Sequence, residues 1–259
     1  MRISLALLLC LWYLTPSYAE IQTKAIEYRD GDVVLEGFAA WDSERASEKS
    51  PGVLVVHQWM GLSDYEKSRC RQLAELGYVA FALDIYGQGV RPDNPADAAK
   101  QAGTYKADRS LYRKRLNLGL EQLRQLSGVD GERVAAIGYC FGGTGVIELA
   151  RSGAEVKGAV SFHGGLDSPA PEDGTHIKAK LLILHGEDDP FVPLEDVEAM
   201  QAEFNAAGVD WQMIAYSQTV HSFTQPMAGN DNAKGAAYNE RSDKRSWLAM
   251  QQFFDELFE

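Results

Sequence analysis

The chain has 259 residues, 45% of them hydrophobic and 24% charged, so it is long enough to bury a substantial core. Its 37 acidic residues outnumber its 25 basic residues, which gives a formal net charge of −12. Nucleic acid and anionic membranes are themselves negatively charged and attract basic surfaces. We therefore expect no nucleic-acid partner and no stable membrane association.

Residues 1–19 have the pattern of a secretory signal peptide. Arg2 precedes the apolar run 3–14, and Ser17-Tyr18-Ala19 ends the segment in a small-x-small cleavage pattern. The run is too short to span a bilayer comfortably. A buried N-terminal helix is the alternative, but polar residues follow at once and nothing would cap it. We expect an exported protein, periplasmic or secreted, whose remaining chain carries 24 − 37 = −13 charges.

Beyond residue 19 the sequence alternates between strand and helix patterns. Two strands, 25–28 and 33–40, flank an Asp-Gly turn signal and predict an opening hairpin. The segment 86–107 contains Gly, Pro and Asp and is expected to cross the surface with some helix. The other predicted strands are 51–56, 78–84, 133–138, 156–162, 180–185 and 211–216. The other predicted helices are 64–76, one with Leu116, Leu120, Leu123 and Leu126 on a single face, 142–151, one after Pro193, and a last one with Trp247, Met250, Phe254 and Leu257 on one face.

This alternation predicts an α/β fold. Strands that are apolar throughout are typical of a parallel sheet that helices cover on both faces. We therefore expect a mostly parallel central sheet flanked by helices, in one domain over residues 20–259. Repeats and linkers are absent from the sequence pattern.

The pentapeptide Gly138-Tyr139-Cys140-Phe141-Gly142 joins a predicted strand to a predicted helix. The form Gly-x-nucleophile-x-Gly is typical of a strained elbow that exposes a nucleophile above the carboxyl end of a sheet. The following helix end would present the Phe141 N–H to an anion and lower the pKa of the thiol. A phosphate-binding loop would require Gly-Lys-Ser/Thr, and a dinucleotide loop a further glycine, and both are missing. A buried, inert cysteine is the serious alternative, and it is the reading we prefer for Cys70.

A nucleophile of this kind needs a base, and the base needs a group that orients it. Asp188 and Asp189 follow the strand 180–185, and His221 lies in a loop after the strand 211–216. The order nucleophile, acid, histidine is that of the α/β-hydrolase fold. Helix capping by the aspartates and an ordinary loop histidine are the alternatives. All three coincidences in the right order favour catalysis.

The chain resembles the dienelactone hydrolase family of α/β-hydrolases, which uses Cys-Asp-His. The resemblance covers nearly the whole chain after residue 19 and rests on "HQWMGL" (57–62), "GYCFGG" (138–143), "GEDDPFVP" (186–193) and "HSFT" (221–224). It implies Cys140 as the nucleophile, His221 as the base and Asp189 as its orienter. It also implies that the backbone N–H groups of Trp59 and Phe141 form the oxyanion hole.

Three positions depart from the family. Gln58 stands where the family often has a glutamate that influences the protonation of the thiol. Gln225 and, in a looser alignment, Gln101 stand where dienelactone hydrolase proper has the two arginines that bind its substrate's carboxylate. A buried carboxylate needs a charged partner. We therefore expect a small neutral ester or lactone as the substrate.

The pattern predicts a small pocket with no large lid. Residues expected to shape this substrate pocket are Gln58, Tyr86, Tyr105, Phe162, His163 and Gln225, together with Trp59. The five histidines show no metal-binding spacing, so we expect neither a metal nor a cofactor. A thioesterase or another acyl-transfer hydrolase is one alternative activity, and a non-catalytic thiol redox or binding module is another. The sequence does not indicate an oligomeric state.

Overall fold

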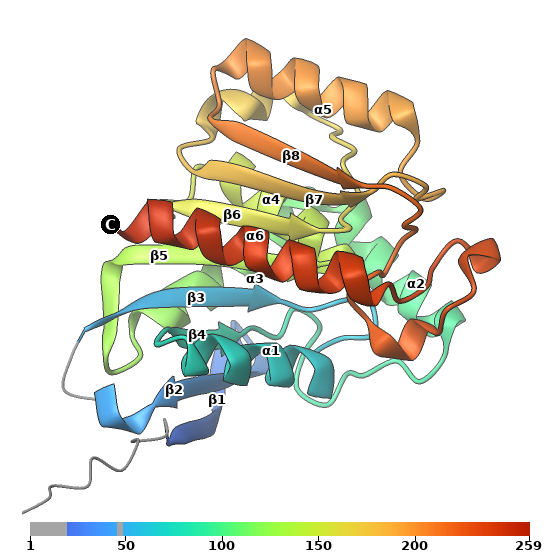
Figure 1. Ribbon diagram of the computed structural model, residues 1–259. Coiled ribbons are helices and arrows are strands. Elements are labelled where there is room, and N and C mark those ends of the chain that lie inside the picture. Colours follow the sequence, from blue (N-terminus) through green and yellow to red (C-terminus); the bar gives the residue numbers. More distant parts are fainter. Residues whose placement is uncertain (1–19, 46–48) are drawn as a thin grey trace, which may run out of the picture.

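One eight-stranded sheet forms the centre of the molecule (Figure 1). The computed structural model describes residues 20–45 and 49–259, so the predicted signal peptide lies outside the described residues. The strands follow the order β1-β2-β4-β3-β5-β6-β7-β8 across the sheet. Their bounds are Ile21–Asp30 (β1), Val33–Asp42 (β2), Ser50–Val56 (β3), Val79–Ala82 (β4), Val129–Tyr139 (β5), Gly158–Phe162 (β6), Lys180–Gly186 (β7) and Trp211–Tyr216 (β8).

The sheet is mostly parallel, as the sequence predicts. β1 and β2 form the expected antiparallel hairpin, and β2 also pairs antiparallel with β4. All other neighbouring strands are parallel, so the carboxyl ends of β3 and β5 to β8 meet at one edge of the sheet. That edge is where α/β folds place their sites.

Helices cover both faces of the sheet. The core on one side includes side chains of α1 and α6, and the core on the other includes side chains of α2, α3, α4 and α5. Figure 1 shows α1 and α6 together in front of the strands. Across the described ranges, none of the helices combines the length and the apolar character that a membrane crossing requires. The helices are Asp64–Glu75 (α1), Pro95–Ala107 (α2), Arg109–Arg124 (α3), Phe141–Arg151 (α4), Leu194–Ala207 (α5) and Glu240–Phe258 (α6), and short 3₁₀ turns span Ser43–Arg45, Pro171–His176, Pro226–Ala228 and Asn232–Lys234.

Two elements differ from the sequence prediction. β5 begins at Val129 rather than at residue 133, because its register against β3 shifts where Asp130 gives way to Val134. Gly131, Glu132 and Arg133 lie between these two paired positions, and Asp130-Gly131 has the composition of a turn. The segment 86–107 is more regular than expected, since α2 takes up its last 13 residues.

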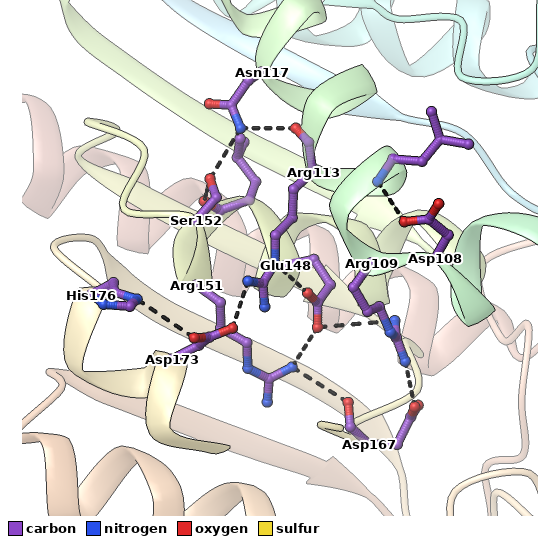
Figure 2. Close-up of polar contacts among 12 residues, drawn as sticks. Asp108, Arg109, Arg113, Asn117, Glu148, Arg151, Ser152, Asp167, Asp173 and His176 are labelled. Atoms are coloured by element: carbon purple, nitrogen blue, oxygen red, sulfur yellow. Dashed lines mark hydrogen bonds and ion pairs between the residues drawn. The ribbon is translucent and has the colours of Figure 1, made fainter. Parts of the chain in front are cut away.

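Buried ion pairs hold the helices of one face together (Figure 2). Glu148 of α4 has a fully buried side chain and lies 2.8 Å from Arg113 and 2.9 Å from Arg151. Arg151 also pairs with Glu203 of α5 at 2.6 Å. Because a buried carboxylate is stable only with such partners, this network fixes α4 against α3 and α5. The first residue of α4 is Phe141, which directly follows Cys140, so the network and the cysteine turn lie on the same helix.

Candidate active site

Cys140 occupies a sharp turn between β5 and α4. Its backbone has φ 55° and ψ −116°, a conformation that is strained for any residue except glycine. The glycines of the motif explain how the turn closes. A Cβ on Gly138 would lie 1.9 Å from the Gly142 carbonyl oxygen, and a Cβ on Gly142 would lie 2.2 Å from the Val56 carbonyl oxygen. The sequence thus folds here into the nucleophile elbow that the pentapeptide predicts.

The structure brings Cys140, Asp189 and His221 together. Nε2 of His221 lies 3.0 Å from Sγ of Cys140, and Nδ1 of the same ring lies 2.8 Å from Oδ2 of Asp189. The Asp189 side chain is fully buried, and its second oxygen accepts a hydrogen bond from the Phe191 N–H at 2.9 Å. Asp188, the neighbouring candidate, is exposed. The contacts run from thiol to imidazole to carboxylate, the arrangement of a nucleophile, its base and an orienter.

The His221 loop is fixed by its own backbone. His221 donates its N–H to the Gly235 carbonyl at 3.1 Å and accepts from the Ala237 N–H at 3.0 Å. The Phe191 ring packs edge-on against the imidazole with the centroids 5.5 Å apart. These contacts hold the ring between Cys140 and Asp189.

Electrostatics favour a charged thiolate–imidazolium pair. Burial by itself raises the pKa of the Cys140 thiol, but the His221 ring and the Phe141 N–H outweigh this effect, so that the pKa is lowered from its ordinary 9.0. Burial likewise opposes protonation of His221, yet Cys140 and the Asp189 carboxylate raise its pKa to about 10. Each group therefore stabilises the charged form of the other, as in activated cysteines generally.

The Phe141 N–H interacts with the Cys140 thiol, and Trp59 lies on the wall of the same cavity. Phe141 begins α4, where the first N–H groups lack acceptors within the helix. Trp59 lies in the loop after β3, and within the described chain its N–H donates to no protein acceptor. Glu66 of α1 fixes this loop by accepting from the Gln58 N–H at 3.2 Å and from the Ser63 N–H at 2.9 Å. Both Trp59 and Phe141 border the cavity above Cys140.

The cavity at Cys140 measures about 250 Å³. One wall is a face of α2 with small side chains, which leaves room for a substrate, and another is the segment around Phe191 that follows Asp189. The residues that line the cavity are Trp59, Ala99, Ala102, Gly103, Lys106, Cys140, Phe141, Thr144, Gly165, Phe191, Val192 and His221.

Tyr86, Tyr105 and Phe162, which were expected to shape the pocket, pack in the core and are not among the residues that line this cavity. The rings of Tyr86 and Tyr105 stack on each other at 5.5 Å within the core. Phe162 stacks on Tyr139 at 4.6 Å in the core of the opposite face. Each ring packs against an aromatic neighbour, and the Tyr86 hydroxyl donates to the carbonyl of Trp59, which does line the cavity, at 3.0 Å.

The polar residues expected in the pocket are also not among the residues that line the cavity. Gln58 and His163 are buried and absent from the cavity surface. Gln225 caps a 3₁₀ turn by accepting from the Met227 N–H at 3.2 Å. Gln101 is half-buried in α2 and does not line the cavity either. A position next to a motif in the sequence thus did not indicate whether the side chain of a residue faces the cavity.

The α2 wall is the part of the site that sequence reasoning missed. A signal was available, since Asn94-Pro95 is typical of a helix start. In the structure the Asn94 side chain accepts from the Asp97 N–H at 3.0 Å and Pro95 is the first helical residue. Had the helix been predicted, its spacing would have placed Ala99, Ala102 and Lys106 on one face.

Other sulfur and metal chemistry finds little support in the described residues. Cys70 and Cys140 are both free, and Cys70 is fully buried in the core, as expected. Among residues 20–45 and 49–259, no group of three or more His, Cys, Asp or Glu side chains could hold a metal ion.

The parallel sheet, the elbow after β5 and the aligned acid and histidine define the α/β-hydrolase fold. Residues 36–258 match the family model described as "Dienelactone hydrolase family". The chain therefore belongs to the dienelactone hydrolase family, and its class of activity is carboxylic ester hydrolysis.

Known proteins similar to this chain agree with the family. A protein of Aquifex aeolicus named "Putative carboxymethylenebutenolidase" is 28% identical over 239 residues, 88% of this chain and 96% of that protein. A solved structure titled "m3DLH" is 39% identical with a TM-score of 0.89, covering 92% of this chain and 99% of that one. The crystal structure of a dienelactone hydrolase-like promiscuous phosphotriesterase from metagenomic libraries is 38% identical with a TM-score of 0.87, and covers the same shares.

Proposed function

We propose that this protein hydrolyses a small neutral carboxylic ester or lactone with Cys140 as the nucleophile, His221 as the base and Asp189 as the orienter of the base. The observation that carries the proposal is the pair of contacts made by the His221 ring, 3.0 Å to the thiol and 2.8 Å to the carboxylate. The lowered pKa of the thiol supports it, because the thiolate is the reactive form.

The reaction proceeds through a thioester. The Cys140 thiolate attacks the ester carbonyl, and the N–H groups of Trp59 and Phe141 stabilise the oxyanion, with each such donor worth about 3–4 kcal/mol in the transition state. His221 gives its proton to the leaving alkoxide, which departs as an alcohol. The neutral imidazole then takes a proton from water, and the resulting hydroxide equivalent cleaves the thioester to an acid and regenerates the thiolate.

The cavity supports a small substrate without a negative charge. Its volume of about 250 Å³ suits a short acyl group. Lys106 is the one lysine or arginine among its lining residues, and its charge already acts on the Cys140 thiol, whose pKa it helps to lower. The two glutamines at the family's arginine positions add no charge. These observations favour a neutral ester or lactone over an anionic dienelactone.

The similarity to the promiscuous phosphotriesterase favours a second activity for the same site. The thiolate would attack phosphorus of a neutral phosphotriester, an alcohol or phenol would leave with the His221 proton, and water would then cleave the P–S bond. Turnover of diethyl p-nitrophenyl phosphate by the wild-type protein, and its loss in Cys140→Ala, tests this activity.

Hydrolysis of p-nitrophenyl acetate and butyrate by the wild-type protein and by Cys140→Ala tests the main proposal. We expect clear turnover that disappears in the variant, and a thioester mass adduct on Cys140 when the reaction is quenched early. Equal activity in both proteins would refute the role of Cys140. Preferred cleavage of acyl thioesters would identify a thioesterase instead. Fast reaction with peroxide and no acyl transfer would identify a thiol sensor.

We also propose that residues 1–19 direct export. The support is the sequence pattern of a basic residue, an apolar run and Ser17-Tyr18-Ala19. Expression of the full chain followed by cell fractionation and N-terminal sequencing tests this. A mature protein that starts at Glu20 outside the cytoplasm is expected, and an uncleaved cytoplasmic chain would contradict it.

A further inference from the structure

His163 lies directly behind the nucleophile. It follows β6, is fully buried, and has an unusual positive φ of 42°. Its Nδ1 accepts a hydrogen bond from the Cys140 N–H at 3.1 Å, and the same N–H lies 3.0 Å from the Phe162 carbonyl oxygen. His163 therefore contacts the backbone of the strained residue that carries the thiol.

The other ring nitrogen of His163 contacts the loop that carries the base. Nε2 lies 2.8 Å from Oγ1 of Thr224, three residues after His221. Because Nδ1 accepts a proton-bearing N–H, the neutral ring carries its own hydrogen on Nε2 and donates it to Thr224. One imidazole thus joins the Cys140 backbone to the loop of His221.

The Thr224 end of this bridge is fixed by α1. The Tyr65 hydroxyl donates to Oγ1 of Thr224 at 2.7 Å, and Arg69 donates to the Thr224 carbonyl at 3.4 Å. Arg69 also donates to the Tyr65 hydroxyl at 3.2 Å. With both sides of Thr224 held, a shift of the His221 loop would break hydrogen bonds that are buried, which is costly.

We propose that His163 is a positioning residue that sets the distance between Cys140 and His221 by bridging the Cys140 N–H and the Thr224 hydroxyl. The inference rests on the proposed function, in which these two residues react together. The bridge works only with a neutral ring, since a protonated Nδ1 cannot accept from the Cys140 N–H.

The surroundings of His163 keep it neutral. Burial, the nearby His221 ring at a centroid distance of 5.3 Å, Arg69 and His185 all lower the pKa of His163, leaving it well below the ordinary value. His221 is the ring that carries the positive charge, so the two rings divide their roles: one is charged and reacts, and the other is neutral and positions.

Four variants test the bridge. His163→Asn keeps an acceptor near the Nδ1 position, and His163→Gln keeps a donor near the Nε2 position, so each retains one half of the bridge. Thr224→Val removes the hydroxyl, and Thr224→Ser is its matched control. For each protein we would measure kcat and KM for p-nitrophenyl acetate, the thermal midpoint, and the iodoacetamide alkylation rate of Cys140 against pH.

We expect Thr224→Val and both His163 variants to lower kcat by about 10- to 100-fold, the range expected for a reacting group misplaced by about 1 Å. KM should change by no more than about threefold, and Thr224→Ser should retain wild-type kcat. The alkylation profile of the three impaired variants should move to higher pH, because the thiolate has lost its close contact with the imidazolium.

The proposal is overturned if folded variants keep the wild-type kcat and alkylation profile, or if Thr224→Ser fails as severely as Thr224→Val. Should the His163 variants fail to fold, the Thr224 pair decides the question. If the wild-type protein hydrolyses no ester, the alkylation profile still measures the Cys140–His221 contact, so failure of the proposed function is distinguishable from failure of the bridge.

Discussion

Replacement of Asp189 by asparagine should impair both the charge and the orientation of His221. The carboxylate accepts from Nδ1 of the imidazole at 2.8 Å and is fully buried, so solvent does not screen it. Asparagine keeps the size and the Phe191 N–H contact, but it removes the negative charge and can present an N–H to Nδ1, which selects the wrong tautomer. We expect a folded protein with a slow active site.

The size of the effect follows from the pKa of His221. That pKa is raised from an ordinary 6.5 to about 10, which corresponds to a free energy on the order of 5 kcal/mol. Cys140 and Asp189 together cause this rise. Cys140 is the largest cause of the rise and Asp189 the next, so loss of the Asp189 carboxylate removes part of this energy, and kcat/KM should fall by at least about 10-fold, the equivalent of one pKa unit. The tautomer error adds to this loss, so about 10-fold is the smallest loss expected.

The dependence of kcat/KM on pH is the assay that separates this explanation from a general loss of activity. In the wild-type protein the rate should rise as the pH increases through the lowered pKa of Cys140, and fall as it passes about 10, where His221 loses its proton. In Asp189→Asn the alkaline limb should move to lower pH, because one of the two groups that raise the His221 pKa has lost its charge.

The adjacent residue, Asp188, provides a matched control. Asp188→Asn makes the same chemical change at an exposed side chain and should leave both kcat/KM and the pH profile at wild-type values within about twofold. The reasoning would be refuted if Asp189→Asn lost less than about threefold, or if its alkaline limb remained near pH 10.

Three further substitutions probe the elbow, the ion network and the cavity. Gly138→Ala places a Cβ 1.9 Å from a backbone oxygen, so it should lower the unfolding free energy by about 3 kcal/mol in a urea titration and abolish ester turnover. Gly131→Ala is the control, because a Cβ at that position has no heavy atom within 4 Å, and it should change neither quantity. Glu148→Gln removes the counter-charge of buried arginines and should lower the unfolding free energy by about 3 kcal/mol in the same titration. Glu155→Gln makes the same change at an exposed ion pair and should leave the urea midpoint unchanged. Equal midpoints for the two variants would contradict the role of the network. Phe191→Ala removes an apolar wall and should raise KM for p-nitrophenyl butyrate about 3- to 10-fold more than for the acetate, which parallel Michaelis curves would show.

The nucleophile elbow and the chain order of the site could be predicted because both depend on local sequence and on sheet topology. Gly138 and Gly142 are required by backbone contacts within the turn itself, so the motif and its conformation coincide. Asp189 and His221 each follow a parallel strand, and parallel strands end at the same edge. Their convergence with Cys140 therefore follows from the fold.

The substrate wall could not be predicted in the same way. Whether Tyr86 or Phe162 faces the cavity depends on how each ring packs against residues remote in sequence, and both are occupied by aromatic neighbours. The same applies to β5, whose start at Val129 is decided by a bulged pairing with β3 and not by its own composition. His163 was expected to shape the substrate pocket, whereas its hydrogen bonds to the Cys140 N–H and to Thr224, and with them its proposed role, required coordinates.

The distribution of the site along the chain has a consequence for its assembly. His221 follows Cys140 by 81 residues and Asp189 by 32, and the strands that precede these residues are the last of the sheet to be synthesised. Contacts between segments so far apart form late in folding, after loop closure has been achieved. A chain that ends after β6 would contain the elbow cysteine without its imidazole, and its thiol would have ordinary reactivity. The reactive thiolate would thus appear only once the chain is complete and folded. The unfolded chain would be protected from modification at Cys140. The return of Cys140 alkylation at neutral pH would therefore report the last step of folding.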